Sequence, residues 1–528
     1  MSSTPRVDIA ILGAGFAGSI LAMALARQGR SVALIERGRH PRFAIGESST
    51  PLADRALERI ADRYDLPQLN SLATYGRWKA SVPLLTCGAK RGFSYFYHQP
   101  HEFFTTDNRH SRELLVAANR DLDNADTHWL RSDVDTYLVQ QARDMGVSYY
   151  DDTDLEPHYE MDEPVGYFSL SGTCSGRPWT LLSRFLIVAT GSPVPNDWRL
   201  PPPNFGYGPR YFRTNTRAIF AHFTNVRPWR DILDEQRIDC ADHPFDCDQS
   251  ALHHVFPGGW MWQLRFDDGT TSAGFAIDNL DGSMPGAPTD AKGNNQAVKH
   301  LTPEEEWHYW LSRLPSVRRQ FEQTSVVRPA DGIRRVSRLQ RACVPSKAKQ
   351  STPGRSVYAW APLPAALGFA DPLHSTGIAH TLFNVERLLE VLDVMDDPSA
   401  LEDALQKYFR RLACEVDLLD RMISLAYRQT HDFEAFATAT MPYFAAATSC
   451  ESRAPTSLAS PSSPDAFLLA DDAKFLAALE AIESVTNSTS NLDPCPTQTV
   501  ANFLAPFNQV GLFSPKTPNM YRYTATKG

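Results

Sequence analysis

A glycine-rich turn near the N-terminus restricts the fold of this chain more than any other feature. The apolar run Arg6–Leu12 leads into Gly13–Gly18, which reads Gly-Ala-Gly-Phe-Ala-Gly, and a helical pattern follows over Ser19–Gln28. A second apolar strand, Ser31–Ile35, ends at the acidic residue Glu36. This order of strand, G-x-G-x-x-G turn, helix, strand and acid is typical of a βαβ dinucleotide-binding unit.

The residues of this unit, at positions 6–37, have separate tasks. Gly13 permits the tight turn, Gly15 lets the backbone approach a pyrophosphate, and Gly18 lets the helix pack closely on the strand. The amides at the helix N-terminus face the phosphates. Glu36 is placed to accept hydrogen bonds from the ribose hydroxyls, so we predict that the chain binds a dinucleotide.

Composition and charge exclude several classes of protein. Fifty-two basic against 61 acidic residues give a net charge of −9, whereas proteins that grip nucleic acid are usually basic. The eight cysteines form no C-x-x-C pair, so neither a zinc ribbon nor a redox pair is indicated, and reduced thiols suit a cytoplasmic protein. The apolar stretch Val7–Ala26 is interrupted by the three glycines and follows no basic segment, so we expect no membrane span.

A second group of residues favours FAD over NAD. Asp371 stands shortly before a predicted helix that begins at Ser375-Thr376-Gly377, and an apolar strand ends in Ala189-Thr190-Gly191. A carboxylate at this place can hold a ribityl chain, and helix amides can face the flavin edge that becomes negative on reduction. We therefore expect FAD as the cofactor.

The remaining pattern predicts one large α/β core with a helical end. We expect an FAD-binding core over 1–430, with strand-rich insertions on the substrate side at about 80–130 and 205–345. We expect 431–528 to be mostly helical, with a mobile Ser/Pro-rich loop at about 449–464. The fold class is therefore α/β: a Rossmann-like FAD-binding domain of the glutathione-reductase/hydroxylase type, an inserted β-rich substrate region and a helical C-terminal region.

Several elements can be predicted one by one. Trp260–Phe266 and Thr271–Ile277 are expected to form a hairpin, and Ser375–Met395 a long helix. Asp133 is expected to cap another helix, and Ser81–Tyr97 has a strand-like pattern.

Five segments together resemble the flavin-dependent halogenases, and the resemblance extends over the chain up to about residue 430. Gly46–Pro51 (GESSTP) resembles the flavin-loop motif of that family, and Trp260-Met261-Trp262 the core of its Trp-x-Trp-x-Ile-Pro signature. Asp371–Gly377 resembles its flavin and halide loop, and Cys87–Phe93 the segment with its active-site lysine. With His253–Phe256, the chain is most similar to the phenol-acting branch, typified by the phloroglucinol halogenase.

This resemblance implies a two-site mechanism. Reduced FAD, provided by a separate flavin reductase, and O2 would convert chloride or bromide to hypohalous acid, which then reaches Lys90 beside the substrate. The backbone of Thr376 and Gly377 would bind the halide. Lys90 would either donate a hydrogen bond to hypohalous acid as an ammonium ion or carry the halogen as a haloamine, which needs a neutral amine. The cofactor-binding residues implied are Gly13, Gly15, Ala17, Gly18, Glu36, Ser48, Ser49, Arg131 and Asp371.

Several assignments stay open. Lys79 competes with Lys90, although Lys90 matches the family segment better. Leu264 and Arg265 stand where the family has Ile and Pro, so the Trp motif is either a weakened barrier to hydroxylation or hairpin packing.

Three histidines are further candidates. His374 replaces a usual aromatic residue and is either a functional histidine, titrating between about pH 5.5 and 7.5, or a hydrogen-bonded wall residue. His253 and His254 point to opposite faces of a strand, so no metal is expected there.

The sequence therefore predicts a cytoplasmic FAD-dependent halogenase that acts on an electron-rich, phenolic substrate. Trp260, Trp262 and His374 are candidates for the substrate side. The alternatives are an aromatic hydroxylase of the same fold and a flavin-binding protein without catalysis. The substrate, the halide preference and the oligomeric state, a homodimer included, stay open.

Overall fold

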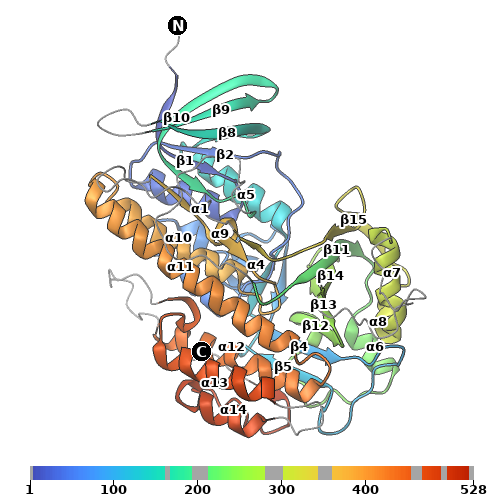
Figure 1. Cartoon of the computed structure of the whole chain (residues 1–528). Coiled ribbons are helices and arrows are strands. Elements are labelled where there is room, and N and C mark those ends of the chain that lie inside the picture. Colours follow the sequence, from blue (N-terminus) through green and yellow to red (C-terminus); the bar gives the residue numbers. More distant parts are fainter. Residues whose placement is uncertain are drawn as a thin grey trace, which may run out of the picture.

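Two large sheets and their covering helices make up the fold. The computed structural model describes residues 4–160, 167–192, 212–279, 301–342, 359–453, 466–488 and 496–522. Figure 1 shows the N-terminal sheet at the top, the second sheet at the lower right and the C-terminal helices at the bottom. The predicted fold class, a Rossmann-type FAD domain joined to sheets and helices, is confirmed.

The first sheet contains the predicted βαβ unit. β1 lies between β2 and β10 and is parallel to both, because the connection through α1 returns the chain to the same sheet edge. β7 and β18 add parallel strands, and β9 and β8 extend β10 as an antiparallel ribbon. The strands are β1 (Arg6–Leu12), β2 (Val32–Ile35), β7 (Ser148–Tyr150), β8 (Thr153–Glu160), β9 (Tyr167–Cys174), β10 (Arg177–Val188) and β18 (Trp360–Pro362).

The second sheet has the order β15-β11-β14-β13-β12-β4-β5-β20, with β16 also paired to β11. It contains the predicted hairpin, since β13 and β14 pair antiparallel from Gly259 to Ile277. The strands are β4 (Gly92–Tyr97), β5 (Glu113–Ala117), β11 (Thr216–Thr224), β12 (Ala251–Phe256), β13 (Gly259–Arg265), β14 (Thr271–Asp278), β15 (Ser325–Arg328), β16 (Arg334–Val336) and β20 (Met520–Tyr521).

Two short sheets join the large ones. β3 (Cys87–Lys90) pairs with β6 (Asp126–Trp129), and β17 (Arg341–Ala342) pairs with β19 (Gly368–Phe369).

Helices pack on both sheets and on one another. α1 packs against α5 and α10, and α6 to α8 bury Trp229, Trp307 and Trp310 against the second sheet. The helices are α1 (Phe16–Arg27), α2 (Pro51–Arg63), α3 (Pro67–Asn70), α4 (Tyr75–Ser81), α5 (Arg131–Asp144), α6 (Trp229–Glu235), α7 (Pro303–Arg313), α8 (Pro315–Gln320), α9 (Pro364–Leu367), α10 (Gly377–Asp393), α11 (Pro398–Tyr427), α12 (Phe433–Arg453), α13 (Ala473–Ser488) and α14 (Thr497–Leu504). None of these helices is long and apolar enough to cross a membrane.

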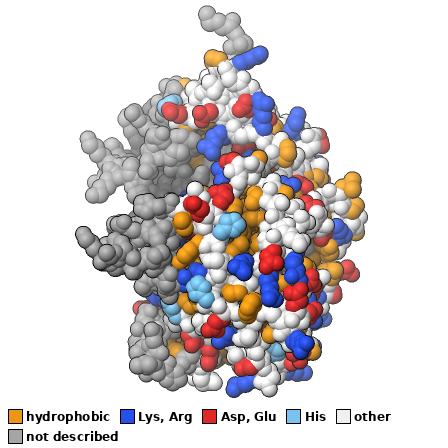
Figure 2. Space-filling view, turned by 90° about the vertical axis from the view of Figure 1, so that its right-hand side faces the viewer, with side chains coloured by type: hydrophobic (Ala, Val, Ile, Leu, Met, Phe, Trp, Pro, Cys, Tyr) orange, Lys and Arg blue, Asp and Glu red, His pale blue; other side chains and the backbone are white. Residues whose placement is uncertain are grey.

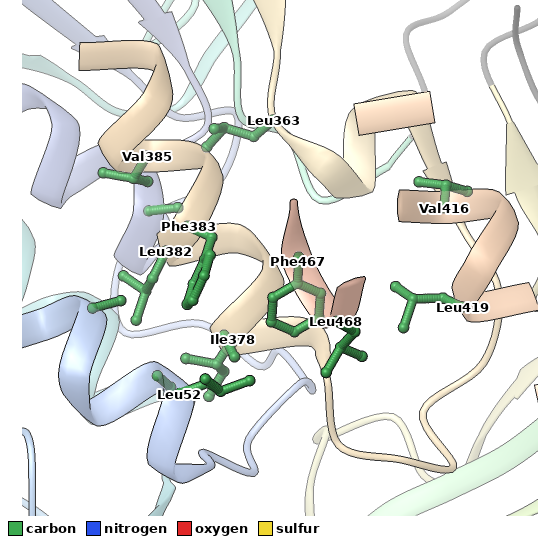
Figure 3. Close-up of a cluster of buried hydrophobic side chains, with 14 of the residues drawn as sticks. Leu52, Leu363, Ile378, Leu382, Phe383, Val385, Val416, Leu419, Phe467 and Leu468 are labelled. Atoms are coloured by element: carbon green, nitrogen blue, oxygen red, sulfur yellow. The ribbon is translucent and has the colours of Figure 1, made fainter. Parts of the chain in front are cut away.

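A shared core joins the FAD domain to the helical C-terminal region. Figure 3 shows Leu52 of α2, Phe383 of α10, Leu419 of α11 and Phe467 in one apolar cluster. The boundary predicted at residue 430 falls in the turn between α11 and α12, and buried side chains on both sides of it belong to this core. On the face drawn in Figure 2, acidic and basic side chains are intermixed.

Three local predictions were wrong. The helix expected to be capped by Asp133 begins at Arg131, with Leu130 as its N-cap. The strand-like pattern from Ser81 starts as the last residue of α4. α12 continues to Arg453, so the first residues of the loop predicted at 449–464 are helical, and the rest of that prediction lies outside the described residues.

Candidate active site

The glycine turn has the geometry that its sequence predicted. Gly13 has a φ of +106°, and a Cβ there would collide with the carbonyl of Ala189, the residue that follows β10. A Cβ on Gly18 would collide with the Gly13 carbonyl, so glycine is required for this close packing of α1 on β1. A Cβ on Gly15 would lie 3.2 Å from Arg131 Nη2, which places Arg131 directly over the turn.

Glu36 closes the turn from the end of β2. Its carboxylate accepts hydrogen bonds from the Ala14 N–H (3.1 Å), the Gly38 N–H (3.1 Å) and Arg42 Nη2 (3.0 Å). Burial alone would raise the pKa of Glu36, but Arg42 and the two N–H donors outweigh it and lower the pKa. The carboxylate is therefore charged and held at the position from which a ribose could be bound.

Arg131 connects the glycine turn to the flavin loop. Its Nε and Nη2 each donate to Asp135 at 2.9 Å, and its Nη1 donates to the carbonyls of Ile45 (3.0 Å) and Gly46 (3.2 Å). Asp135 in turn accepts from the Phe16 N–H at the start of α1 (3.0 Å). A cationic side chain and a helix N-terminus thus meet at one place, which suits a pyrophosphate.

A cavity of about 360 Å³ begins at this place and extends to the Trp pair of β13. It brings together most of the predicted site residues. Those that line it are Gly15, Ala17, Ser48, Arg131, Trp260, Trp262, Asp371, Thr376 and Gly377. Four other predicted cofactor residues do not line the cavity but adjoin residues that do: Gly13, Gly18, Glu36 and Ser49. Together, the lining and adjoining residues fit FAD.

Asp371 lies on the cavity wall in a chain of hydrogen bonds. It accepts from the Leu373 N–H (3.1 Å), Thr216 Oγ1 (2.7 Å) and Tyr427 Oη (3.0 Å), and Tyr427 accepts from Trp260 Nε1 (2.7 Å). Burial raises the pKa of Asp371 to about 7, against the hydrogen bonds from Thr216 and Tyr427. The flavin side and the Trp motif are therefore joined by one buried chain, in which sequence reasoning missed Tyr427.

The predicted halide loop turns sharply before α10. Ser375 has a φ of +52°, and α10 begins at Gly377 with Thr376 as N-cap. A Cβ on Gly377 would meet no atom within 4 Å, and Gly377 lines the cavity. Free amides at a helix N-terminus suit an anion.

The Trp pair lines the cavity and is also packed in the hairpin. The rings of Trp260 and Trp262 lie 5.9 Å apart on one face of β13, and Gly274 opposite Trp262 leaves room for its ring. Arg265, which replaces the family's Pro, points elsewhere: its Nε donates to Asp248 at 2.7 Å, and its Nη1 to the Val226 carbonyl at 3.0 Å.

The two candidate lysines differ in their surroundings. Lys90 is 0% exposed at the end of β3, and its Nζ donates a hydrogen bond to the Ser49 carbonyl and lies 4.2 Å from the centre of the Phe93 ring. Burial lowers the pKa of Lys90 to about 8, with Asp126 and Asp54 acting in the opposite direction. Lys79 is on the surface in an ion pair with Asp267 (2.8 Å), its side chain 37% exposed.

The flavin loop holds Lys90 through a strand that both share. β6 pairs with β3 on one side, and on the other it bonds to the loop, since the Ser49 N–H donates to the Thr127 carbonyl at 3.0 Å. Lys90 does not line the cavity. It contacts the cavity wall through Ser49, which is next to the lining residue Ser48. The charge of Lys90 also helps to lower the pKa of the lining residue His253.

The histidines near Lys90 are neutral. His374 stacks on Tyr443 with 4.5 Å between ring centres, and burial lowers the pKa of His374 to about 3. The expectation that it titrates between pH 5.5 and 7.5 is therefore wrong. The alternative expectation, that His374 is a hydrogen-bonded residue of the wall, is also wrong, because neither of its ring nitrogens has a hydrogen-bond partner among the described residues. His253 and His254 do face opposite sides of β12: His253 stacks on Tyr95, and His254 contacts Trp229.

Sequence reasoning also missed two carboxyls and a contact between a glutamate and a histidine. Asp54 and Asp126 lie beside Lys90, and Glu47 of the flavin loop pairs with His222 of β11 at 2.8 Å. Glu47 belongs to a quoted motif, so it could have been singled out; Asp54 and Asp126 have no sequence signal of their own.

One buried group outside the cavity has ligand-like spacing. His110, Glu113 and His243 lie within reach of one another, with His110 Nδ1 2.7 Å from Glu113. These contacts are explained as ion pairs. The absence of a metal stays a prediction.

Comparison with known proteins agrees with this geometry. The family model "FAD dependent oxidoreductase" matches residues 8–159. The chain is similar to monodechloroaminopyrrolnitrin halogenase PrnC of Pseudomonas fluorescens, with 27% identity over 81% of this chain and 68% of that protein. It is similar to tetracycline 7-halogenase of Kitasatospora aureofaciens, with 29% identity over 71% of this chain and 61% of that protein.

Solved structures show the same fold. Halogenase PltM in complex with phloroglucinol and FAD superposes with a TM-score of 0.76 and 20% identity, covering 98% of this chain and 99% of PltM. Another crystal structure of halogenase PltM gives a TM-score of 0.75. The chain is thus similar in sequence to flavin-dependent halogenases over most of its length, and with its glycine turn and cavity it has the fold of a halogenase structure.

Proposed function

We propose that this protein halogenates an electron-rich, phenolic ring with hypohalous acid delivered at Lys90. The observation that carries the proposal is the position of Lys90, which is fully buried and hydrogen-bonded to Ser49 of the flavin loop. The neighbouring loop residue Ser48 lines the same cavity as the start of α10 at Thr376 and Gly377. The complex of PltM with phloroglucinol and FAD supports a phenolic substrate here.

The residues divide into a cofactor side and a substrate side. Gly13, Gly15, Gly18, Glu36, Arg131 and Asp371 would hold FAD, together with Ala17, Ser48 and Ser49 of the turn and loop. The chemistry that bound, reduced FAD would supply with O2 is the oxidation of chloride or bromide to hypohalous acid.

The protein's own contribution is binding, exclusion of water and positioning. The amides at Thr376 and Gly377 would hold the halide, and the Trp260–Trp262 wall would separate the two sides. At Lys90, Nζ would donate a hydrogen bond to the oxygen of hypohalous acid and so direct the halogen toward the ring. A phenol activates its own ring carbons, so the site needs no strong base to start the reaction.

Turnover in trans tests the proposal. The protein is incubated with FAD, NADH, a separate flavin reductase, bromide and a panel of phenols, and products are analysed by mass. We expect a brominated product that requires the protein. Hydroxylated product without halide incorporation would assign the chain to the aromatic hydroxylases, and absence of both would indicate flavin binding alone. We further propose a cytoplasmic location and a reductase partner.

A further inference from the structure

Lys90 and Asp126 are direct neighbours across two strands. Lys90 ends β3 and pairs in register with Asp126, the first residue of β6. Residues directly opposite in an antiparallel pair have Cβ atoms about 4.5–5.5 Å apart, so these side chains share one face of the small sheet. Both are 0% exposed. The Lys90 amine and the Asp126 carboxyl are thus enclosed together.

A second carboxyl completes the group. Asp54 of α2 accepts a hydrogen bond from Ser49 Oγ at 2.7 Å, and the Ser49 carbonyl accepts from Lys90. Burial, and then the charge of Asp126, raise the pKa of Asp54 well above its usual range. Burial also raises the pKa of Asp126, but Lys90 opposes this. Lys90 thus favours the charged form of Asp126, whereas burial and the charge of Asp126 both disfavour the charged form of Asp54.

The other groups that face Lys90 are uncharged. Burial lowers the pKa of both His128 on β6 and His253 on β12 to about 3. Tyr443 of α12 lies near Asp126, and its pKa is raised by burial. Phe93 on β4 presents its ring face to Nζ. Among the described residues that act on Lys90, the carboxyl pair is thus the source of negative charge.

We propose that Asp126, with Asp54 as its partner, is a positioning residue that holds Lys90 as an ammonium ion during halogen transfer. This inference rests on the proposed function and favours an ammonium at Lys90 over the haloamine that the family resemblance also allows. Without a nearby carboxylate, an ammonium in so dry a place would lose its proton.

The ammonium also balances the reaction. A ring carbon attacks the halogen of hypohalous acid, the carbon–halogen bond forms, and the oxygen–halogen bond breaks. The departing hydroxide takes a proton from Lys90 and leaves as water. The neutral amine then removes the ring proton, which restores both the aromatic ring and the ammonium. The sum is ArH + HOX → ArX + H2O, with hypohalous acid as the only oxidant.

The pH profile of halogenation tests the proposal. Hypohalous acid transfer should decline as pH rises through the pKa of Lys90, about 8. Asp126→Asn removes the charge that favours the ammonium, so this decline should move to lower pH by about one unit or more. Asp126→Glu should restore most of the wild-type profile, and Asp54→Asn should shift it less, because Asp126 acts more strongly on Lys90 than Asp54 does. Asp267→Asn is the matched control: it removes the carboxylate of the exposed pair with Lys79 and should shift nothing.

A second readout does not need turnover. Lysine side chains labelled with 13C are followed by NMR during a pH titration, and the Lys90 signal is identified by its loss in Lys90→Met. Its midpoint should be lower in Asp126→Asn than in the wild type. An unchanged midpoint, or halogenation that increases with pH through the Lys90 titration, overturns the proposal. If the midpoint shifts as expected but the wild type halogenates no phenol, the proposed function fails and the Asp126–Lys90 relation stands.

Discussion

Lys90 Nζ donates its hydrogen bond to the backbone carbonyl of Ser49, which lies 41 residues earlier in the chain. Ser49 belongs to the GESSTP loop beside the flavin side, and Lys90 is the residue expected to act on the substrate. The bond therefore joins the two halves of the site. Because its acceptor is a backbone carbonyl, a mutation of the Ser49 side chain would leave that acceptor in place.

The first prediction separates the two lysines. Lys90→Ala should leave FAD binding and oxygen consumption nearly intact and should lower halogenated product by about 10²-fold or more, the usual range for a positioned proton donor. Lys90→Arg should also fail, because a guanidinium is wider and stays charged. Product and peroxide are measured together in single turnovers. Lys79→Ala is the control and should cost little, since that side chain is in a surface ion pair; loss of product in Lys79→Ala alone would reverse the assignment.

The second prediction concerns the glycine turn. Gly15→Val should reduce FAD affinity by at least about tenfold, or 1.4 kcal/mol, because a side chain there meets Arg131 and fills the approach to the pyrophosphate. Affinity is measured by quenching of flavin fluorescence. Gly176→Ala strains a turn with a φ of +74° far along the β9–β10 ribbon and serves as a control for strain alone. Equal FAD affinity of Gly15→Val and wild type would mean that the cofactor binds elsewhere.

The third prediction tests halide binding by the α10 amides. Activity should saturate with bromide or chloride. Gly377→Pro removes the first helical amide at a position where proline is tolerated, so the halide concentration for half-maximal rate should increase, whereas Gly377→Ala keeps the amide and should not change it. A proline disfavours helical backbone angles in the residue before it, and Thr376 has such angles. FAD binding of Gly377→Pro is therefore checked first, to show that the variant is folded. An unchanged halide requirement in Gly377→Pro would remove this amide from the site.

The fourth prediction is a pH dependence of stability. The folded pKa of Asp371 is about 7, above the unfolded value near 3.9, so between these values the folded state holds a proton that the unfolded state has lost. Stability should therefore fall as pH rises from about 4 to 7. Urea midpoints of apo wild type and Asp371→Asn are compared across this range, and the variant should lack this part of the slope. Parallel slopes would show that Asp371 has an ordinary pKa.

The fifth prediction concerns His374. Because burial keeps this ring neutral, the halogenation rate of His374→Phe should have the same pH profile as the wild type between pH 5.5 and 7.5. A profile that flattens in the variant would show that His374 titrates after all.

Sequence patterns predicted those parts of the site that lie within single segments. The glycine turn, the hairpin and the start of α10 are local, because each depends on residues a few positions apart. The Glu47–His222 pair could not be predicted, since it depends on how the flavin loop meets β11. Asp126 stands in a polar stretch of sequence and is buried only because β6 pairs with β3. Asp133 is a good capping residue, but Arg131 and Asp135, held by the turn and the flavin loop, extend α5 to an earlier start.

The chain of hydrogen bonds from Trp260 through Tyr427 to Asp371 has a consequence for anyone who wishes to alter the substrate range. Trp260 is an obvious position to vary, since it lines the cavity. Its indole N–H, however, is one end of a relay whose other end is the carboxyl expected to hold the ribityl chain. A library of variants at this position is therefore selected for flavin binding as well as for substrate binding. Variants without an indole N–H are expected to be inactive because they bind flavin less well, and not because they reject the substrate. Pairing each Trp260 variant with a change at Tyr427 would free the two selections from each other.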